Sequence, residues 1–383
     1  MTAADVVAAV MFAAVVAYAV FGGADFGSGV WDLLAGDARR GSSVRRLVDH
    51  AIGPVWEANH VWLIFILVFL WTGFPEPFAV LMQALAVPFW LVGLGVVLRG
   101  AGFALRKYAP TLEAARLAGL AFALSSLITP FFLGSIAGVV ASGRIRPDAP
   151  TLGLEAALTP SSLLGGLLAV LTCTFLAGVF LAAEAHRTGQ AELADTLRRR
   201  ALVVGAVTGG VALIGVVPLE QDAPTLADGL TGRAAPLVVL SALAGAATLV
   251  LLHRGAIAVA RVGAVVAVAA VVTGWGVGQY PWILVDEVTI AEGAGAHPTL
   301  VGLLVAAGVA AVLVVPALVL LFVLADGNRV GSLPGIGPEA PAESASGHSG
   351  SDRPASQPAS GRPESQAASG QTGSGQTEGH QEP

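Results

Sequence analysis

Charge is scarce in this chain of 383 residues: only 12% are Asp, Glu, Lys or Arg, whereas 55% are hydrophobic. A soluble globular chain carries about 25% charged residues, so this chain lacks the polar side chains that would cover a water-facing surface. The hydrophobic residues fall in separate blocks of roughly 20, the length of a helix that crosses a ~30 Å hydrocarbon core. The alternating pattern of a transmembrane β-barrel is absent. We therefore expect an all-α, polytopic integral membrane protein.

Cysteine and basic clusters are equally sparse. The one cysteine, Cys173, lies inside an apolar block, which excludes an intrachain disulfide and a cysteine-rich metal or iron–sulfur site. No basic segment interleaved with aromatic residues is present, so nucleic-acid binding is unsupported. The sequence also has no Walker loop and no identifiable nucleophile with a neighbouring base. The candidates that remain for chemistry are ionisable residues within the apolar blocks.

Nine apolar blocks predict nine transmembrane helices, separated by turn-forming residues such as those of Phe74-Pro75-Glu76-Pro77. The expected spans cover residues 5–34, 53–73, 78–103, 114–140, 160–183, 201–219, 235–252, 258–281 and 298–325. We interpret the first block as a mature helix rather than a signal peptide, because no Lys or Arg precedes it. Prolines inside spans are expected to act as kinks, namely Pro88, Pro130 and Pro316.

The distribution of Lys and Arg predicts the orientation. Fourteen of them lie in or beside the connections after spans one, three, five and seven, and the opposite side has only Arg144, Arg146 and Arg233. By the positive-inside rule the N-terminus lies outside and the C-terminus lies in the cytoplasm. Residues 1–327 form the transmembrane domain. Residues 328–383 are rich in Ser, Gly, Gln and Pro and contain no aromatic residue, so we expect a disordered cytoplasmic tail.

Basic side chains near the cytoplasmic ends of spans are expected to reach the lipid head groups: Arg99, Arg106 and Lys107. Of these, Arg99 also lies early enough in its turn to pair with a carboxylate. Three histidines fall in loops or at span ends and are expected to be solvated or interfacial: His186, His253 and His297.

Asp25 is one of the few ionisable residues inside a span. Its insertion costs about 2.5–3.5 kcal/mol, so its presence needs a reason. It lies about 30 Å beyond Asp5 along the first helix, toward the cytoplasmic end. Gly23 and Gly27 beside it are spaced to let another helix approach closely. Two interpretations stay open: a packing motif whose carboxylate bonds a neighbouring backbone or caps a helix, and a proton-relay or cofactor-side carboxylate.

A second group of polar residues opens the second span. Pro54 suits the first turn of a helix, and Glu57 falls in or near that turn, where the helix dipole favours an anion. Gly53, Glu57 and His60 share one helix face. A di-iron bundle would need a second Glu-x-x-His pair and two further glutamates, which the chain lacks, so we predict no metal site. We expect Glu57 and His60 to exchange a proton or to hold a partner's group.

Two aromatic residues of the same segment, Trp56 and Trp62, are expected to anchor the second helix near the interface. Because this helix runs antiparallel to the first, Asp25 and Glu57 both lie near the cytoplasmic face and are expected to begin one proton path. The residues leave open a subunit of a redox complex whose electron carriers sit elsewhere, since His60 is the only histidine within a span. A proton-coupled secondary transporter is the alternative, although it favours a site at mid-depth. A structural membrane scaffold is a third.

Two runs of residues carry a family resemblance. They are Gly23–Val30 and Ile52–Leu63, with motif positions at Gly23, Gly27, Gly53, Pro54, Trp56, Asn59 and Trp62. They resemble subunit II of cytochrome bd-type quinol oxidases over about residues 1–327. The resemblance implies two four-helix bundles plus a peripheral helix. It also places Glu57 at the family's Trp-Asp carboxylate, which is implicated in proton delivery, and Asp25 at the acidic residue of the first element.

The resemblance further implies a heterodimer in a bacterial-type cell membrane. Its partner, subunit I, carries the haems (b, with d left open) and the quinol site; a small accessory subunit also stays open. The complex oxidises quinol and reduces dioxygen to water with cytoplasmic protons, whereas this chain ligates no haem and is not catalytic alone. Two departures from the family pattern are Glu57-Ala58 in place of Asp-Gly and His60 in place of Gln or Glu. They leave the haem complement and the quinol type open.

Overall fold

The computed structural model describes residues 2–36, 41–52, 56–109, 111–148 and 153–326. Within them the chain is almost entirely helical. The elements are α1 (Ala3–Leu34), α2 (Ser42–Ile52), α3 (Trp56–Gly73), α4 (Pro75–Ala84), α5 (Ala86–Tyr108), α6 (Leu112–Ala141), the 3-10 helix η1 (Leu154–Leu158), α7 (Pro160–Arg187), α8 (Ala191–Ile214), α9 (Val216–Asp222), α10 (Pro224–Thr231), α11 (Ala235–His253), α12 (Ile257–Gln279), β1 (Trp282–Leu284), β2 (Val288–Thr289) and α13 (His297–Asp326).

The long helices form because a lipid-exposed backbone must satisfy its own hydrogen bonds. In the described residues, eight helices are long and apolar enough to cross a membrane, or nine when α3 and α4, which meet at a bend of 118°, count as one span. Large side chains such as Leu213, Val262 and Val312 are more than half exposed on their outer faces, as a lipid solvent permits. The all-α, multi-pass prediction is confirmed.

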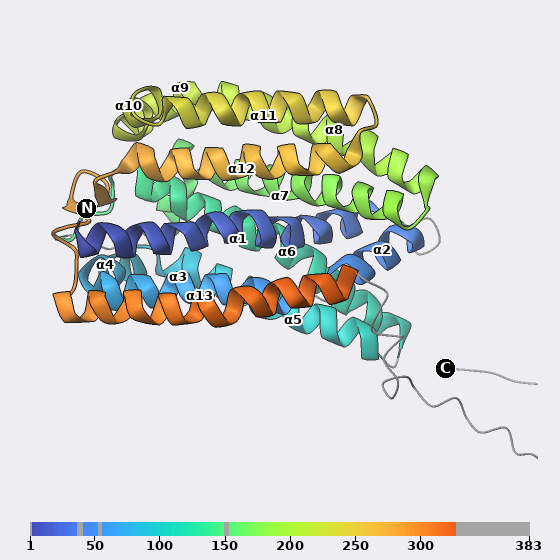
Figure 1. Ribbon diagram of the computed structural model, residues 1–383, viewed down its shortest axis with the longest axis horizontal. Coiled ribbons are helices and arrows are strands. Elements are labelled where there is room, and N and C mark those ends of the chain that lie inside the picture. The colour runs from blue at the N-terminus through green and yellow to red at the C-terminus, as the bar shows by residue number, and fades with distance from the viewer. Residues whose placement is uncertain (1, 37–40, 53–55, 110, 149–152, 327–383) are drawn as a thin grey trace, which may run out of the picture. The chain divides into compact units, whose positions relative to one another are not determined.

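The long helices pack as two groups of four (Figure 1). In the first, α1 contacts α3 and α6, and α5 packs on α6. In the second, α7 packs on α8 and α12, and α11 contacts α8 and α12. The groups meet where α1 and α6 contact α7, and α13 lies against α1 and α3. This pairing agrees with the expected two bundles plus a peripheral helix.

Two of the expected span boundaries were wrong. The block at 78–103 is not one helix, because α4 ends at Ala84 and α5 starts at Ala86, with Leu85 between them outside helical backbone geometry. Pro88 therefore lies in the first turn of α5, where a missing N–H costs nothing, and is not a mid-helix kink. The helix expected at 201–219 begins ten residues earlier, at Ala191, because the charged turn that precedes the apolar block is also helical.

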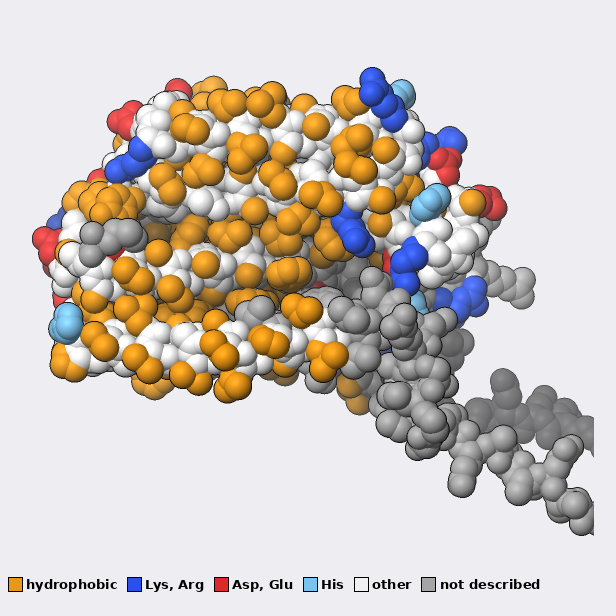
Figure 2. Space-filling model, viewed as in Figure 1, with side chains coloured by type: hydrophobic (Ala, Val, Ile, Leu, Met, Phe, Trp, Pro, Cys, Tyr) orange, Lys and Arg blue, Asp and Glu red, His pale blue; other side chains and the backbone are white. Residues whose placement is uncertain are grey.

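Short elements close both ends of the bundle. The small helices α9 and α10 and the antiparallel β1–β2 pair gather at the end that also holds the N-terminus of α1, and α2 lies at the opposite end (Figure 1). None of these was expected from hydropathy, because each is too short or too polar to form an apolar block. In Figure 2, Lys and Arg gather mainly at the end opposite the N-terminus, whereas hydrophobic side chains cover the length between.

Candidate functional site: a buried ion pair between two helices

A buried ion pair joins α1 to α5. The Arg99 Nη2 atom lies 2.6 Å from Asp25 Oδ1 and also donates to the backbone carbonyl of Asp25 at 2.6 Å. Only 1% of the Arg99 side chain and 2% of the Asp25 side chain are exposed. The expectation that Arg99 extends to the lipid head groups is therefore wrong, and the alternative, a pairing with a carboxylate, is confirmed. A carboxylate inside the bundle offers the guanidinium a stronger partner than water at the interface.

Aromatic and hydroxyl groups complete the surroundings of Arg99. Its guanidinium carbon lies 4.8 Å from the ring centre of Phe26 and 4.5 Å from that of Phe122, within the range of cation–π attraction. Its Nη1 atom donates to the hydroxyl of Ser126, which in turn donates to the carbonyl of Phe122 at 2.6 Å. Three helices, α1, α5 and α6, thus hold one guanidinium in place.

Glycines on α1 make room for this arrangement. A Cβ atom on Gly29 would lie 2.0 Å from Ser126 Oγ, and one on Gly27 would lie 1.8 Å from the carbonyl oxygen of Cys173 on α7. A Cβ on Gly23 would make only ordinary contacts of 3.4 Å and longer. The small residues therefore admit α6 on one face of α1 and α7 on the other, as close helix approach requires.

A second charged group lies seven residues further along both helices. Arg106 on α5 forms ion pairs with Asp32 on α1 and with Asp49 on α2, and Arg45 Nε donates to Asp32 Oδ1 at 2.8 Å. Seven residues are close to two helical turns, so both acids fall on one face of α1 and both arginines on one face of α5, about 10 Å apart along the axes. The two charged groups extend from the membrane-spanning region to the end that holds α2. We call the pairs Asp25–Arg99 and Asp32–Arg106 the ladder.

The polar residues of α3 lie beside the same part of α1. The Asn59 side chain is buried and its Nδ2 atom donates to the carbonyl of Phe21 at 3.4 Å. His60 is half-buried. Trp62, expected at the interface, packs half-buried against the cluster of Tyr18, Phe26 and Cys173. The indole thus fills the space between helices, and its anchoring of α3 near the interface stays a prediction.

Other expected site residues fall outside the described part of the chain. Gly53 and Pro54 are not among the described residues, and the side chains of Trp56 and Glu57 are not described although their backbone begins α3. The pairing of Glu57 with His60 and its proximity to Asp25 therefore stay predictions. The backbone is consistent with a position of Glu57 near Asp25. Helix α3 packs on α1, and Glu57 lies two residues before Asn59, whose side chain bonds to α1.

Some polar atoms in this region lack hydrogen-bond partners within the described residues. They are Asp25 Oδ2, Tyr18 Oη and Thr129 Oγ1, all inaccessible to solvent. Buried polar atoms are normally satisfied by protein or by ordered water. Asp25 Oδ2 is thus a buried carboxylate oxygen that can accept a further hydrogen bond.

Sequence reasoning missed Asp32, Arg106 and Ser126 as members of the site. One signal was present, since the acids at 25 and 32 and the arginines at 99 and 106 repeat at the same seven-residue interval. No group of three or more His, Cys, Asp or Glu side chains in the described ranges is placed to hold a metal ion.

Comparisons with known proteins agree with this architecture. The sequence model of the family "Cytochrome bd terminal oxidase subunit II" matches residues 3–325. The structure of a bd oxidase from Geobacillus thermodenitrificans aligns with a TM-score of 0.72 and 26% identity, covering 85% of this chain and 98% of that one.

Two curated proteins of Bacillus subtilis are also similar. A cytochrome bd ubiquinol oxidase subunit 2 is 29% identical over 39% of this chain and 44% of its own length. A putative cytochrome bd menaquinol oxidase subunit II is 24% identical over 56% of this chain and 61% of its own length. The chain thus spans about half the length of the curated relatives it matches. With a family match over nearly all of its helical part, this multi-pass bacterial membrane protein belongs to the cytochrome bd terminal oxidase subunit II family.

Proposed function

We propose that this chain is the subunit II of a bd-type quinol oxidase that oxidises quinol and reduces dioxygen to water. Family membership supports this function over a proton-coupled secondary transporter. One relative is named for ubiquinol and the other for menaquinol, so we assign the electron donor only as a quinol. The chain would act within a complex and not catalyse the reaction alone.

The haems of such a complex are assigned to the partner, subunit I. A haem iron is held by axial His, Met, Cys or Tyr ligands. Away from the ends of the described spans, His60 is the single histidine, Cys173 is buried in the contact between α1 and α7, and Tyr18 packs edge-on against Phe26. We assign no haem to these residues, and this chain would stabilise the haem-bearing subunit through helix packing.

The observation that carries a role in proton delivery is the buried Asp25–Arg99 pair. A charged pair inside a span is costly and usually marks an ion or proton path. The ladder to Asp32 and Arg106 leads to the arginine-rich end, which the positive-inside rule assigns to the cytoplasm. We propose that protons enter at this end and pass Asp25, Glu57 and His60 on their way to subunit I.

The roles of the two carboxylates differ in this proposal. Asp25 is held by the Arg99 guanidinium, so it fixes the position of that side chain and orients water at its second carboxylate oxygen. Glu57 begins a helix, and its longer side chain is the group we assign to transfer the proton.

The experiment is Glu57→Gln in the intact complex purified from native membranes. The substitution keeps the size and polarity of the side chain but removes the ionisable carboxyl group that would take up and release a proton. We expect oxygen consumption with a quinol donor to fall at least tenfold per haem, while the haem content and the amount of complex stay unchanged. Loss of the complex with unchanged activity per haem would instead show a purely structural role.

A further inference from the structure

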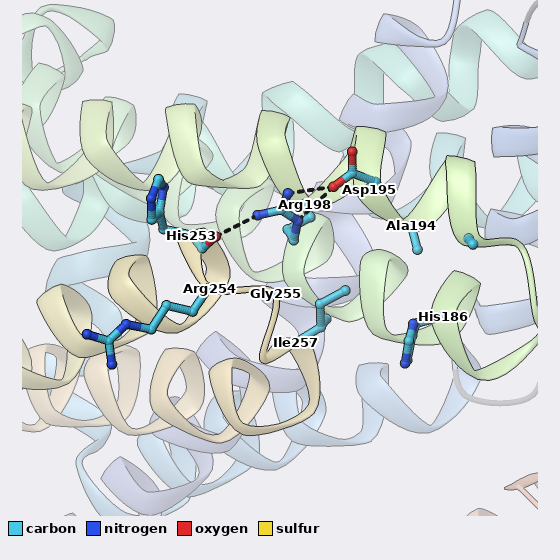
Figure 3. A pocket seen from close by; sticks show the side chains of 9 residues that line it. His186, Ala194, Asp195, Arg198, His253, Arg254, Gly255 and Ile257 are labelled. Carbon is cyan, nitrogen blue, oxygen red and sulfur yellow. Dashed lines mark hydrogen bonds and ion pairs between the residues drawn. The ribbon is translucent and has the colours of Figure 1, made fainter.

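A cleft lies at the arginine-rich end of the molecule, away from the ion pair described above. It has a volume of about 260 Å³ and is formed by the α7–α8 and α11–α12 hairpins. Its lining includes His186, Asp195, Arg198, His253, Arg254 and Ile257. Figure 3 shows Arg198 and Asp195 of α8 beside the turn that carries His253 and Arg254.

Arg198 builds the cleft by tying the two hairpins together. Its Nη1 atom donates to the carbonyl of Leu252 at 2.5 Å and to that of His253 at 3.2 Å, and its Nε atom donates to Asp195 at 3.0 Å. The arginine thereby satisfies carbonyls at the C-terminus of α11, where a cation is favoured. The cleft is a fixed feature of the fold, held by a side chain that is 18% exposed.

The cleft carries surplus positive charge. Its one carboxylate, Asp195, is neutralised by Arg198 and by Arg199, whose Nη2 atom lies 2.6 Å away. Arg254 is exposed and has no ion pair or side-chain hydrogen bond within the described residues, and the exposed imidazoles of His186 and His253 add N–H donors. A site with these groups favours an anion that accepts several hydrogen bonds, such as a phosphate group.

Apolar side chains continue from the cleft toward the middle of the membrane. Val203 on α8, Val250 on α11, and Val259 and Val262 on α12 are each 48–61% exposed and lie within about two turns of the cleft residues. In Figure 2 hydrophobic side chains cover the helices up to the blue cluster at this end. A partner that fits both parts needs an anionic head and an apolar tail.

We propose that this cleft binds the phosphate of an anionic phospholipid, whose acyl chains lie along the exposed valines of α8, α11 and α12. Basic pockets between transmembrane helices are known to suit such head groups. This lipid-binding proposal rests on the proposed function in one respect: the function assigns the arginine-rich end to the cytoplasmic side of the membrane, so the lipid would belong to the cytoplasmic leaflet. Lipid binding is independent of turnover, so its failure and a failure of the Glu57→Gln experiment are distinguishable.

The test measures phospholipid retained by the intact complex in detergent, using native mass spectrometry with added phosphatidylglycerol or, as the zwitterionic probe, phosphatidylcholine. We expect selective retention of phosphatidylglycerol by the wild type. Arg254→Gln should lower it about fivefold, the effect of losing about 1 kcal/mol for one basic contact. The control is Arg146→Gln, which removes an exposed arginine at the opposite end and should change nothing.

Further measurements distinguish a lipid phosphate from free inorganic phosphate and from an acidic protein. Millimolar inorganic phosphate should not displace the lipid, because it lacks the acyl chains; full displacement would identify a phosphate site and overturn the lipid assignment. Equal retention of phosphatidylglycerol and phosphatidylcholine would also overturn the lipid assignment. So would an equal loss of lipid in Arg254→Gln and in the control Arg146→Gln. An acidic protein that copurifies with the wild type and is lost in Arg254→Gln would show that the cleft binds a protein instead. Should Arg254→Gln fail to assemble, Arg254→Lys keeps the charge and should retain the lipid, while His253→Gln should weaken it.

Discussion

The Arg99 guanidinium holds the Asp25 carboxylate at 2.6 Å inside the helix bundle, where neither side chain is more than 2% exposed. Helix α5 packs mainly on α6, and α6 also contacts α1, so the ion pair ties two helices across a third. Desolvation of two charges can cancel most of their attraction, but removal of one partner leaves the other uncompensated. The pair is therefore a point where a single substitution has a large effect.

Arg99→Met should destabilise the subunit by about 3–5 kcal/mol, because it leaves the Asp25 carboxylate buried without a counter-charge. The double variant Asp25→Asn with Arg99→Met should lose much less, since no charge then remains unpaired. The measurement is the thermal midpoint of the purified complex together with its yield per membrane. A double variant as unstable as Arg99→Met alone would contradict the ion-pair explanation.

Asp32→Asn should also destabilise the subunit, by about 1–3 kcal/mol, because Arg45 and Arg106 both bond to this 6% exposed carboxylate. The matched control is Asp148→Asn. Asp148 pairs with Arg146 at 3.0 Å, but both side chains are more than half exposed, so its loss should cost less than about 0.5 kcal/mol. Similar shifts of the thermal midpoint in both variants would mean that burial does not govern these pairs.

The sequence predicted the membrane architecture well because each apolar block is long enough to cross the bilayer by itself. It failed where the structure depends on polar or short segments: the break at Leu85, the early start of α8 and the small helices at both ends have no hydropathy signal. At the site, Asp25 was recognised from its cost inside a span. For Arg99, pairing with a carboxylate was one of two expectations, and Asp25 was not named as that carboxylate, since the choice depends on how α1, α5 and α6 pack together.

Deletion of residues 328–383 should leave oxygen consumption per haem and the yield of the complex unchanged. The family match ends at residue 325, and the composition of the deleted segment, which lacks aromatic residues, predicts that it buries little apolar surface. The measurement compares the truncated and full-length chains in the same membrane background. A loss of yield at equal transcription would show that this segment supports assembly.

The glycines of α1 offer a prediction in which two similar changes have different effects. Gly27→Ala would place a Cβ atom 1.8 Å from the carbonyl oxygen of Cys173 and 2.8 Å from the Ala177 side chain, so α1 and α7 must move apart. Overpacking of this kind typically costs about 1–3 kcal/mol. We expect a lower thermal midpoint and, since Asp25 lies two residues away, reduced oxygen consumption.

Gly23→Ala is the matched control one turn earlier on the same helix. Its Cβ atom would lie 3.4 Å from Leu176 Cδ1 and 3.5 Å from Cys173 Sγ, which is ordinary contact. Alanine also favours helix over glycine by about 1 kcal/mol, so this variant should be neutral or slightly more stable. A thermal midpoint lowered equally in both variants would mean that α1 tolerates no added side chain on this face. Opposite signs are expected because the close approach of α7 at Gly27, and not glycine content as such, sets the spacing of the helices around Asp25.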